Sequence, residues 1–165
     1  MNIHLSIFCS LLLASAASAG PVMLTVKPVS ENKTADKKKA EVTRAESLSI
    51  RLTNTSATKL EGVTLKWTLY AANLRRGSDT IMVEKSGEMK VTVDANGRYT
   101  DITTPKVAFV YTPTHTESSG SGRRMKSTTV EESGHRYHGY LVQVLSGDVV
   151  IGEAISNESL RKHLK

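Results

Sequence analysis

The strongest constraint on the fold is the alternation of apolar and polar residues between positions 46 and 72. Leu48, Ile50 and Leu52 recur at every second position, which is the spacing of a half-buried β-strand. A short polar turn segment follows, and alternation then resumes around Trp67, the only tryptophan of the chain. A helix would scatter these apolar positions around its axis. The sequence therefore predicts two consecutive strands here.

Further alternating runs bring the number of predicted strands to seven or eight, with turn residues between them. An Asn96–Gly97 pair is a strong hairpin signal, because both residues tolerate the positive φ of a tight turn. So many half-apolar strands bury their faces only by closure or by packing of one sheet on another. The prediction is an all-β protein, a single β-sandwich. Its strands are expected in residues 21–30, 46–53, 63–70, 79–85, 87–93, 106–113, 140–145 and 149–155.

Ten side chains of the best-patterned strands are expected to form the core, because each lies on the apolar face of its strand. They are Leu48, Ile50, Leu52, Val63, Leu65, Trp67, Leu69, Tyr140, Val142 and Val144. The last ten residues predict a short helix that Asn157 or Ser156 would cap.

Residues 1–19 have the pattern of a secretory signal peptide, with an apolar run followed by an Ala17-Ser18-Ala19 cleavage site. The alternative is a short membrane anchor, but the apolar run is shorter than the roughly 20 residues that span a bilayer. The chain is thus expected to be exported, to the periplasm, the outer membrane or the outside of the cell. Residues 20–165 would form one domain without an integral membrane segment. This domain would contain no cysteine, because Cys9 leaves with the signal.

Much of the net charge of +6 comes from two runs, residues 33–44 and 122–126, and each run lies in a segment that is expected to be a loop. One is a Lys-rich loop at residues 31–45, and the other a Ser/Gly-rich basic loop at residues 113–134. Arg123, Arg124 and Lys126 in the second loop are the candidate contact site for an anionic partner. Export argues against nucleic acid. An acidic glycan, anionic lipid headgroups or an acidic protein would suit the positive charge of this loop. The alternative is that the loop binds nothing and is solvated and disordered.

No motif of catalysis or cofactor binding is present in the sequence. There is no nucleophile elbow, phosphate-binding loop or calcium loop. His135 and His138 are spaced as H-x-x-H, with His115 upstream, but a metal site needs a third ligand and the sequence singles out none. We interpret these histidines as exposed loop residues and the chain as a non-enzyme without cofactor or metal.

The strand "SLSIRLTN", a short turn and "VTLKWTL" with its mid-strand Trp67 resemble the B and C strands of immunoglobulin-like and fibronectin-type domains. The "GYLVQV" segment resembles their F strand through Tyr140, Val142 and Val144. The B–F cysteine pair of antibody domains is missing, so the resemblance is to cysteine-free sandwiches. It covers roughly residues 48–155.

The signal, the "LTNTS…LEGVTLKWTLY" block and the "GYLVQVLSGDVVIGEAIS" hairpin also resemble small exported immunoglobulin-like proteins of Akkermansia-type (verrucomicrobial) bacteria. This resemblance implies an envelope protein distantly like type IV pilus components in fold. A pilin keeps a long apolar helix after processing, whereas this chain enters a strand directly after Gly20. The resemblance therefore implies an accessory protein or pilin-like head, and no functional residue carries over.

Two hypotheses follow. The first is a non-catalytic structural or assembly protein of the envelope, which contacts envelope or pilus-like proteins or further copies of itself. The Val149–Ile151 run is apolar on both faces, which suggests burial from both sides by the domain's own sheet or by a partner. The second is a monomeric binding module that uses its basic loops to hold an acidic glycan or a host surface.

Overall fold

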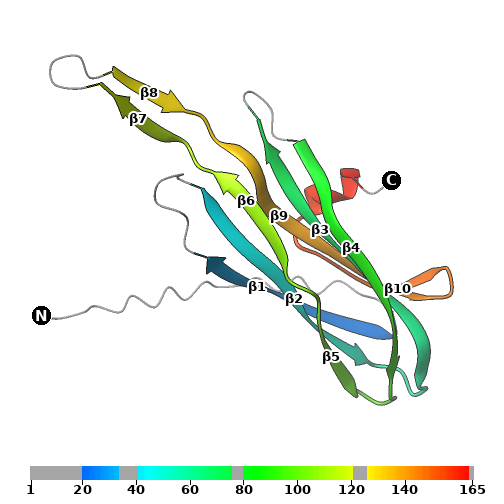
Figure 1. Ribbon diagram of the computed structural model, residues 1–165. Coiled ribbons are helices and arrows are strands. Elements are labelled where there is room, and N and C mark those ends of the chain that lie inside the picture. Colours follow the sequence, from blue (N-terminus) through cyan, green and yellow to red (C-terminus); the bar gives the residue numbers. More distant parts are fainter. Residues whose placement is uncertain (1–19, 34–40, 76–79, 121–125, 164–165) are drawn as a thin grey trace, which may run out of the picture.

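The structure is a computed structural model, and it describes residues 20–33, 41–75, 80–120 and 126–163. These residues form ten strands and one short 3-10 helix, so the fold is all-β as predicted (Figure 1). The predicted signal segment, residues 1–19, lies outside the described residues. The elements are β1 (Val22–Lys33), β2 (Val42–Asn54), β3 (Leu60–Leu74), β4 (Thr80–Val93), β5 (Tyr99–Thr103), β6 (Val107–Thr112), β7 (His115–Ser119), β8 (Lys126–Val130), β9 (Ser133–Ser146), β10 (Val149–Ile155) and η2 (Glu158–His163).

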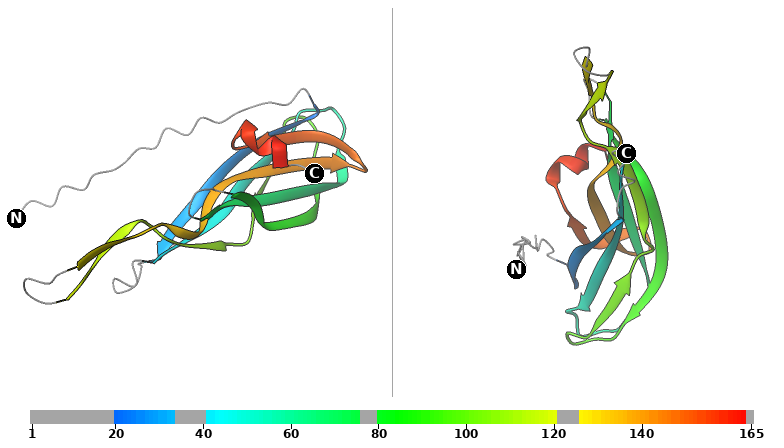
Figure 2. Two further views of the ribbon diagram at one scale, coloured as in Figure 1. Left: turned by 90° about the horizontal axis from the view of Figure 1, so that it is seen from above. Right: turned by 60° about the vertical axis from the view of Figure 1, so that its left-hand side comes forward.

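The strands pack as two layers, which makes the protein a β-sandwich (Figures 1 and 2). In one layer β2 pairs with β1 on one side and with β5 on the other. In the second layer the order is β4-β3-β9-β10, and all pairs are antiparallel. This is the pairing of an immunoglobulin-like or fibronectin-like sandwich, with β2, β3 and β9 in the B, C and F positions that the sequence indicated.

β6 joins the two layers at one end of the sandwich. It pairs with the first half of β2 and, through Tyr111 and Thr112, with the start of β9. β5 pairs with the second half of β2, so β5 and β6 are two parts of one interrupted strand. At the interruption Thr104 replaces the ladder: its N–H donates to the Leu48 carbonyl (3.0 Å), and its Oγ1 accepts from the Leu48 N–H (2.9 Å).

The core lies between the two layers and follows from the period-two pattern, which turns every second side chain inward. All ten side chains expected in the core are buried, and none is more than 8% exposed. Val22, Leu24 and Val26 of β1 and Phe109 of β6 complete the same cluster. The sandwich is therefore held by one continuous apolar core.

The predictions for residues 79–97 differ from the structure in two ways. Two short strands are expected in residues 79–93, but residues 80–93 form the single strand β4, which pairs along β3 with a bulge opposite Leu69 and Tyr70; residue 79 lies outside the described residues. The Asn96–Gly97 turn is present with positive φ at both residues, but it joins β4 to β5 in the other layer. It is therefore a connection between sheets and not a hairpin, because β5 pairs with β2.

Both segments predicted as loops contain strand. β1 extends to Lys33 and β2 begins at Val42, so the described parts of residues 31–45 are mostly a β1–β2 ladder; residues 34–40 lie outside the described residues. Residues 113–134 contain β7 and β8, which pair with each other. Polar residues can form these ladders because the hydrogen bonds between strands join backbone groups only. The pattern of apolar side chains therefore does not predict them.

The C-terminal helix is present as η2, which packs on the outer face of the β9–β10 side of the sandwich (Figure 2). Asn157 caps it, since its Oδ1 accepts from the Ser159 N–H at 2.9 Å. Leu160 is fully buried against Tyr70, Leu141 and Ile155 in a second, smaller apolar cluster. Within the described residues no helix is long and apolar enough to cross a membrane.

Candidate contact surfaces

A two-stranded ribbon projects from one end of the sandwich; we call β7 and β8 the arm (Figures 1 and 2). Its side chains are exposed except at its base, where His115 and Val130 are half-buried. The ladder register places Thr116, Thr129, Ser118 and Ser127 on one face of the arm, so that face carries hydroxyls only. The arm therefore buries almost no apolar surface of its own.

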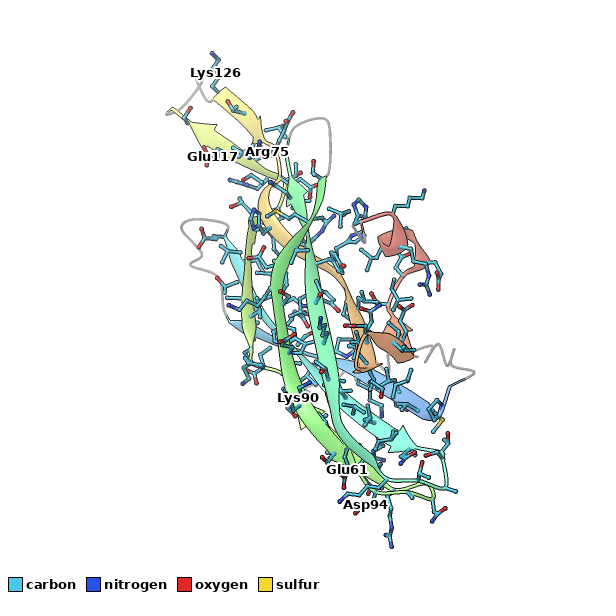
Figure 3. All side chains as sticks on the ribbon, turned by 90° about the vertical axis from the view of Figure 1, so that its right-hand side faces the viewer. Glu61, Arg75, Lys90, Asp94, Glu117 and Lys126 are labelled. Atoms are coloured by element: carbon cyan, nitrogen blue, oxygen red, sulfur yellow. The ribbon has the colours of Figure 1, made fainter. Side chains whose placement is uncertain are left out.

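The candidate anionic contact site is only partly described. Arg123 and Arg124 lie outside the described residues. Lys126 is the first residue of β8, opposite Ser119, and its side chain is exposed at the end of the molecule that carries Glu117 and Arg75 (Figure 3). Glu61 and Asp94 lie at the opposite end. The described part of the basic segment is thus a strand and not a loop.

The histidines lie in strands, which corrects their interpretation as loop residues. His135 of β9 holds Glu84 of β4, with 2.9 Å between Nδ1 and Oε2. His115 Nδ1 lies 3.0 Å from the Pro113 carbonyl oxygen, and His115 Nε2 lies 3.3 Å from Glu117 Oε1. The hydrogen bond to the Pro113 carbonyl is the largest cause of the raised pKa of His115. Among the described residues no three His, Cys, Asp or Glu side chains gather as a metal site would require.

A buried carboxylate lies where β1 and β2 run side by side. Glu46 is 0% exposed, forms an ion pair with Arg44, and accepts hydrogen bonds from Ser30 Oγ at 2.8 Å. The Tyr137 hydroxyl is buried without a hydrogen-bond partner among the described residues, and its ring packs edge-on against Phe109 at 5.4 Å. Because Arg44 and Ser30 satisfy the carboxylate, this cluster joins the strands and is not an open reaction centre.

The β9–β10 hairpin turns at Gly147 as predicted, and it presents two apolar side chains to solvent. Val149 is 65% and Val150 46% exposed, so the domain's own sheet does not bury this run from both sides. A shallow groove lies elsewhere, between η2 and the outer face of β3 and β4. Its volume is about 320 Å³, and its lining includes Tyr70, Val83 and Lys162.

One cluster of side chains was not singled out by the sequence. Arg51 of β2 forms a two-point ion pair with Asp101 of β5, with N–O distances of 2.8 and 2.9 Å. Its guanidinium also lies over the Tyr99 ring, 4.2 Å from the centroid. These residues are about 50 positions apart, and only the β2–β5 register brings them together. No local spacing could have revealed the cluster.

Comparison with known proteins gives no family. No family model matches the chain, and no curated protein matches it. Among solved structures, the X-ray structure of Northeast Structural Genomics Consortium target SoR45 aligns with 68% of this chain and 83% of its own at 13% identity. The TM-score of 0.33 is too low to support any statement about a shared fold or function.

Proposed function

We propose that this chain is a non-catalytic, exported structural or assembly protein of the bacterial envelope, which acts through protein–protein contacts and is associated with pilus-like or other envelope proteins. The arm carries the proposal. A lone two-stranded hairpin is marginally stable in water. The arm has no apolar face to place on the sandwich, because its exposed side chains are mainly Ser and Thr. Contact with a partner would supply the missing stabilisation.

The geometry of the arm favours pairing of backbone with backbone. β7 and β8 pair only with each other among the described strands, so each leaves one row of N–H and C=O groups without a ladder partner. A partner strand added to such an edge gains main-chain hydrogen bonds whatever its sequence. The hydroxyl face of the arm lets a protein approach without burying unpaired charge. Exposed Val149 and Val150 supply a second, apolar contact.

The experiment is sedimentation velocity on residues 20–165 over a wide concentration range, beside a variant in which residues 115–130 are replaced by a short Gly-containing turn. We expect a reversible step to a defined oligomer that the variant lacks, while its melting temperature is unchanged. A matched control is Lys66→Ala, on the outer face of β3 and far from the arm. A chain that stays monomeric at every concentration, alone and with envelope extract fractions, contradicts the proposal.

Binding of an acidic glycan by the basic segment is the second candidate, and the exposure of Lys126 at the start of β8 favours it. Replacing Arg123 and Arg124 together by Ala should then weaken retention on an anionic glycan column, without a change in melting temperature. Salt should lower the retention of the native chain, because screening weakens exposed charges. Unchanged retention of the double variant would reject this site.

A further inference from the structure

The outer face of the β1–β2–β5 layer carries an ordered set of polar side chains. The strand registers align them in three rows across the sheet. We call this surface the β1–β2–β5 face; its rows are Met23–Thr53–Tyr99, Thr25–Arg51–Asp101 and Lys27–Ser49–Thr103. No described element covers it, and Tyr99 and Met23 are 56% and 46% exposed at one end.

The middle of this face is hollowed. A shallow pocket of about 290 Å³ is lined by two hydroxyls, two cations and one carboxylate. The lining residues are Thr25, Lys27, Ser49, Arg51 and Asp101. The Met23–Thr53–Tyr99 row extends the exposed face beyond the pocket, so an extended ligand could reach from the pocket to Tyr99. All five lining residues are polar or charged, which suits a ligand rich in hydroxyl groups better than an apolar peptide.

Arg51 is held in one orientation by two neighbours. Asp101 fixes the plane of the guanidinium through two hydrogen bonds, and the Tyr99 ring supports it from one face. The hydrogen bond from Arg51 lowers the pKa of Asp101, so both groups remain charged at neutral pH. Exposed ion pairs contribute little to folding stability. Folding stability therefore does not explain the arrangement of Arg51, Asp101 and Tyr99. A planar pair of hydrogen-bond donors and acceptors beside an exposed aromatic ring is suited to binding sugar hydroxyls.

Lys27 sets the charge of the ligand. It is exposed on β1, and among the described residues no carboxylate forms an ion pair with it. Arg51 and Asp101 neutralise each other, so Lys27 leaves the face with one positive charge that an anion would balance. We propose that the β1–β2–β5 face binds an acidic polysaccharide. The Arg51–Asp101 pair would hold sugar hydroxyls, Tyr99 would pack against a sugar ring, and Lys27 would hold a uronic carboxylate.

The test is a titration of the 15N-labelled chain with a tetramer of galacturonic acid. We expect amide shifts confined to β1, β2 and β5. Lys27→Ala and Tyr99→Ala should each weaken binding by roughly tenfold with unchanged melting temperature. If Tyr99→Ala does not fold, Tyr99→Leu keeps the apolar contact but removes the ring. Lys66→Ala, which replaces an exposed lysine on the other sheet, should bind as the native chain does.

Four results would overturn the proposal. They are the absence of shifts at millimolar tetramer, equal affinity for a neutral maltotetraose, equal affinity of the Lys27→Ala and native chains, and shifts confined to residues 115–130. The last result would assign the glycan to the arm, and the variant carrying Arg123→Ala and Arg124→Ala would then lose binding. If this site alone fails, the proposed assembly function is unaffected, because oligomerisation is measured separately.

Discussion

At the scale of the residue, Trp67 and Gly87 are fitted to each other across the β3–β4 ladder. Trp67 is 4% exposed, and a Cβ added at Gly87 would lie 2.5 Å from its Cζ2. The glycine is therefore required by the indole ring above it and not by its backbone conformation. It also explains why the sequence around Ser86 and Glu88 reads as a turn between two strands, although β4 is continuous.

This fit makes a prediction that a double-mutant cycle can check. Gly87→Ala should destabilise the fold by about 1–3 kcal/mol, because the methyl group overpacks a buried ring. Trp67→Ala should cost about 3–5 kcal/mol, as large-to-small core changes do. In a Trp67→Leu background the Gly87→Ala cost should fall, which urea unfolding would measure. Ser86→Ala on the same strand is the control. Additive costs would contradict the steric coupling.

Tyr137 gives a pH-dependent prediction. Burial, followed by the charge of Glu46, raises the pKa of its phenol above the usual value. Below about pH 10 the phenol is neutral in both states, and stability is unaffected. As pH rises further the unfolded chain ionises first, so stability must fall. Tyr137→Phe should lessen this alkaline loss and leave stability at pH 7 unchanged or about 1 kcal/mol higher, because no partner is lost.

Tyr140→Phe is the matched control for this prediction, since the Tyr140 hydroxyl donates to the Val26 carbonyl at 3.4 Å. Its removal should cost about 1 kcal/mol at neutral pH. Urea unfolding at pH 7 compares the two variants. Above pH 10 the Tyr137→Phe variant is compared with the native chain, because burial raises the pKa of Tyr140 as well. A large loss of stability in Tyr137→Phe at pH 7 would mean that its hydroxyl has a partner, against the buried, unpaired state described here.

At the scale of the element, η2 spans only six residues and packs on part of the outer face of the second layer. Arg161 ties it to β10 through Glu153 at 2.6 Å, and Leu160 fills the cluster beneath. Leu160→Ala should destabilise by about 2–5 kcal/mol, because it leaves a cavity under a helix with no other buried side chain. Ser159→Ala, exposed on the same helix, should change the free energy of unfolding little.

The measurement is again urea unfolding. If Leu160→Ala were as stable as the native chain, η2 would be only loosely attached to the sandwich. The apolar groove between η2 and β4 would then widen in solution. A loss of stability in Leu160→Ala would instead show that packing of Leu160 holds η2 in place, because a 3-10 helix of this length is not stable without packing.

At the scale of the whole molecule, the sequence predicts the strands whose apolar residues alternate with a period of two. It does not predict the strands and contacts that depend only on how strands pair. Leu48, Ile50 and Val142 alternate because one face of their strand is buried, so β2, β3 and β9 could be identified and placed. The arm could not, because its Ser and Thr residues pair through backbone only. The Arg51–Asp101 cluster depends on strand register across the layer, which no local pattern contains.

The single core also predicts how the molecule unfolds. Side chains of both layers interdigitate in one cluster, and β6 hydrogen-bonds to both layers. Neither layer can therefore expose its inner face without the other, and unfolding should be two-state. Fluorescence of Trp67, the only tryptophan, reports on β3, and far-ultraviolet circular dichroism reports on all strands. The two urea transitions should coincide.

Hydrogen exchange separates the sandwich from the arm. Amides in the central strands β2 and β9 should exchange only through global unfolding, with the same free energy in both layers. Amides of residues 115–119 and 126–130 should exchange far faster, since those strands bury little. Binding of a partner strand should slow the arm amides and leave the core unchanged. Two separated urea transitions would contradict two-state unfolding of the sandwich. Arm amides protected as strongly as those of the core would contradict the expected low stability of the arm.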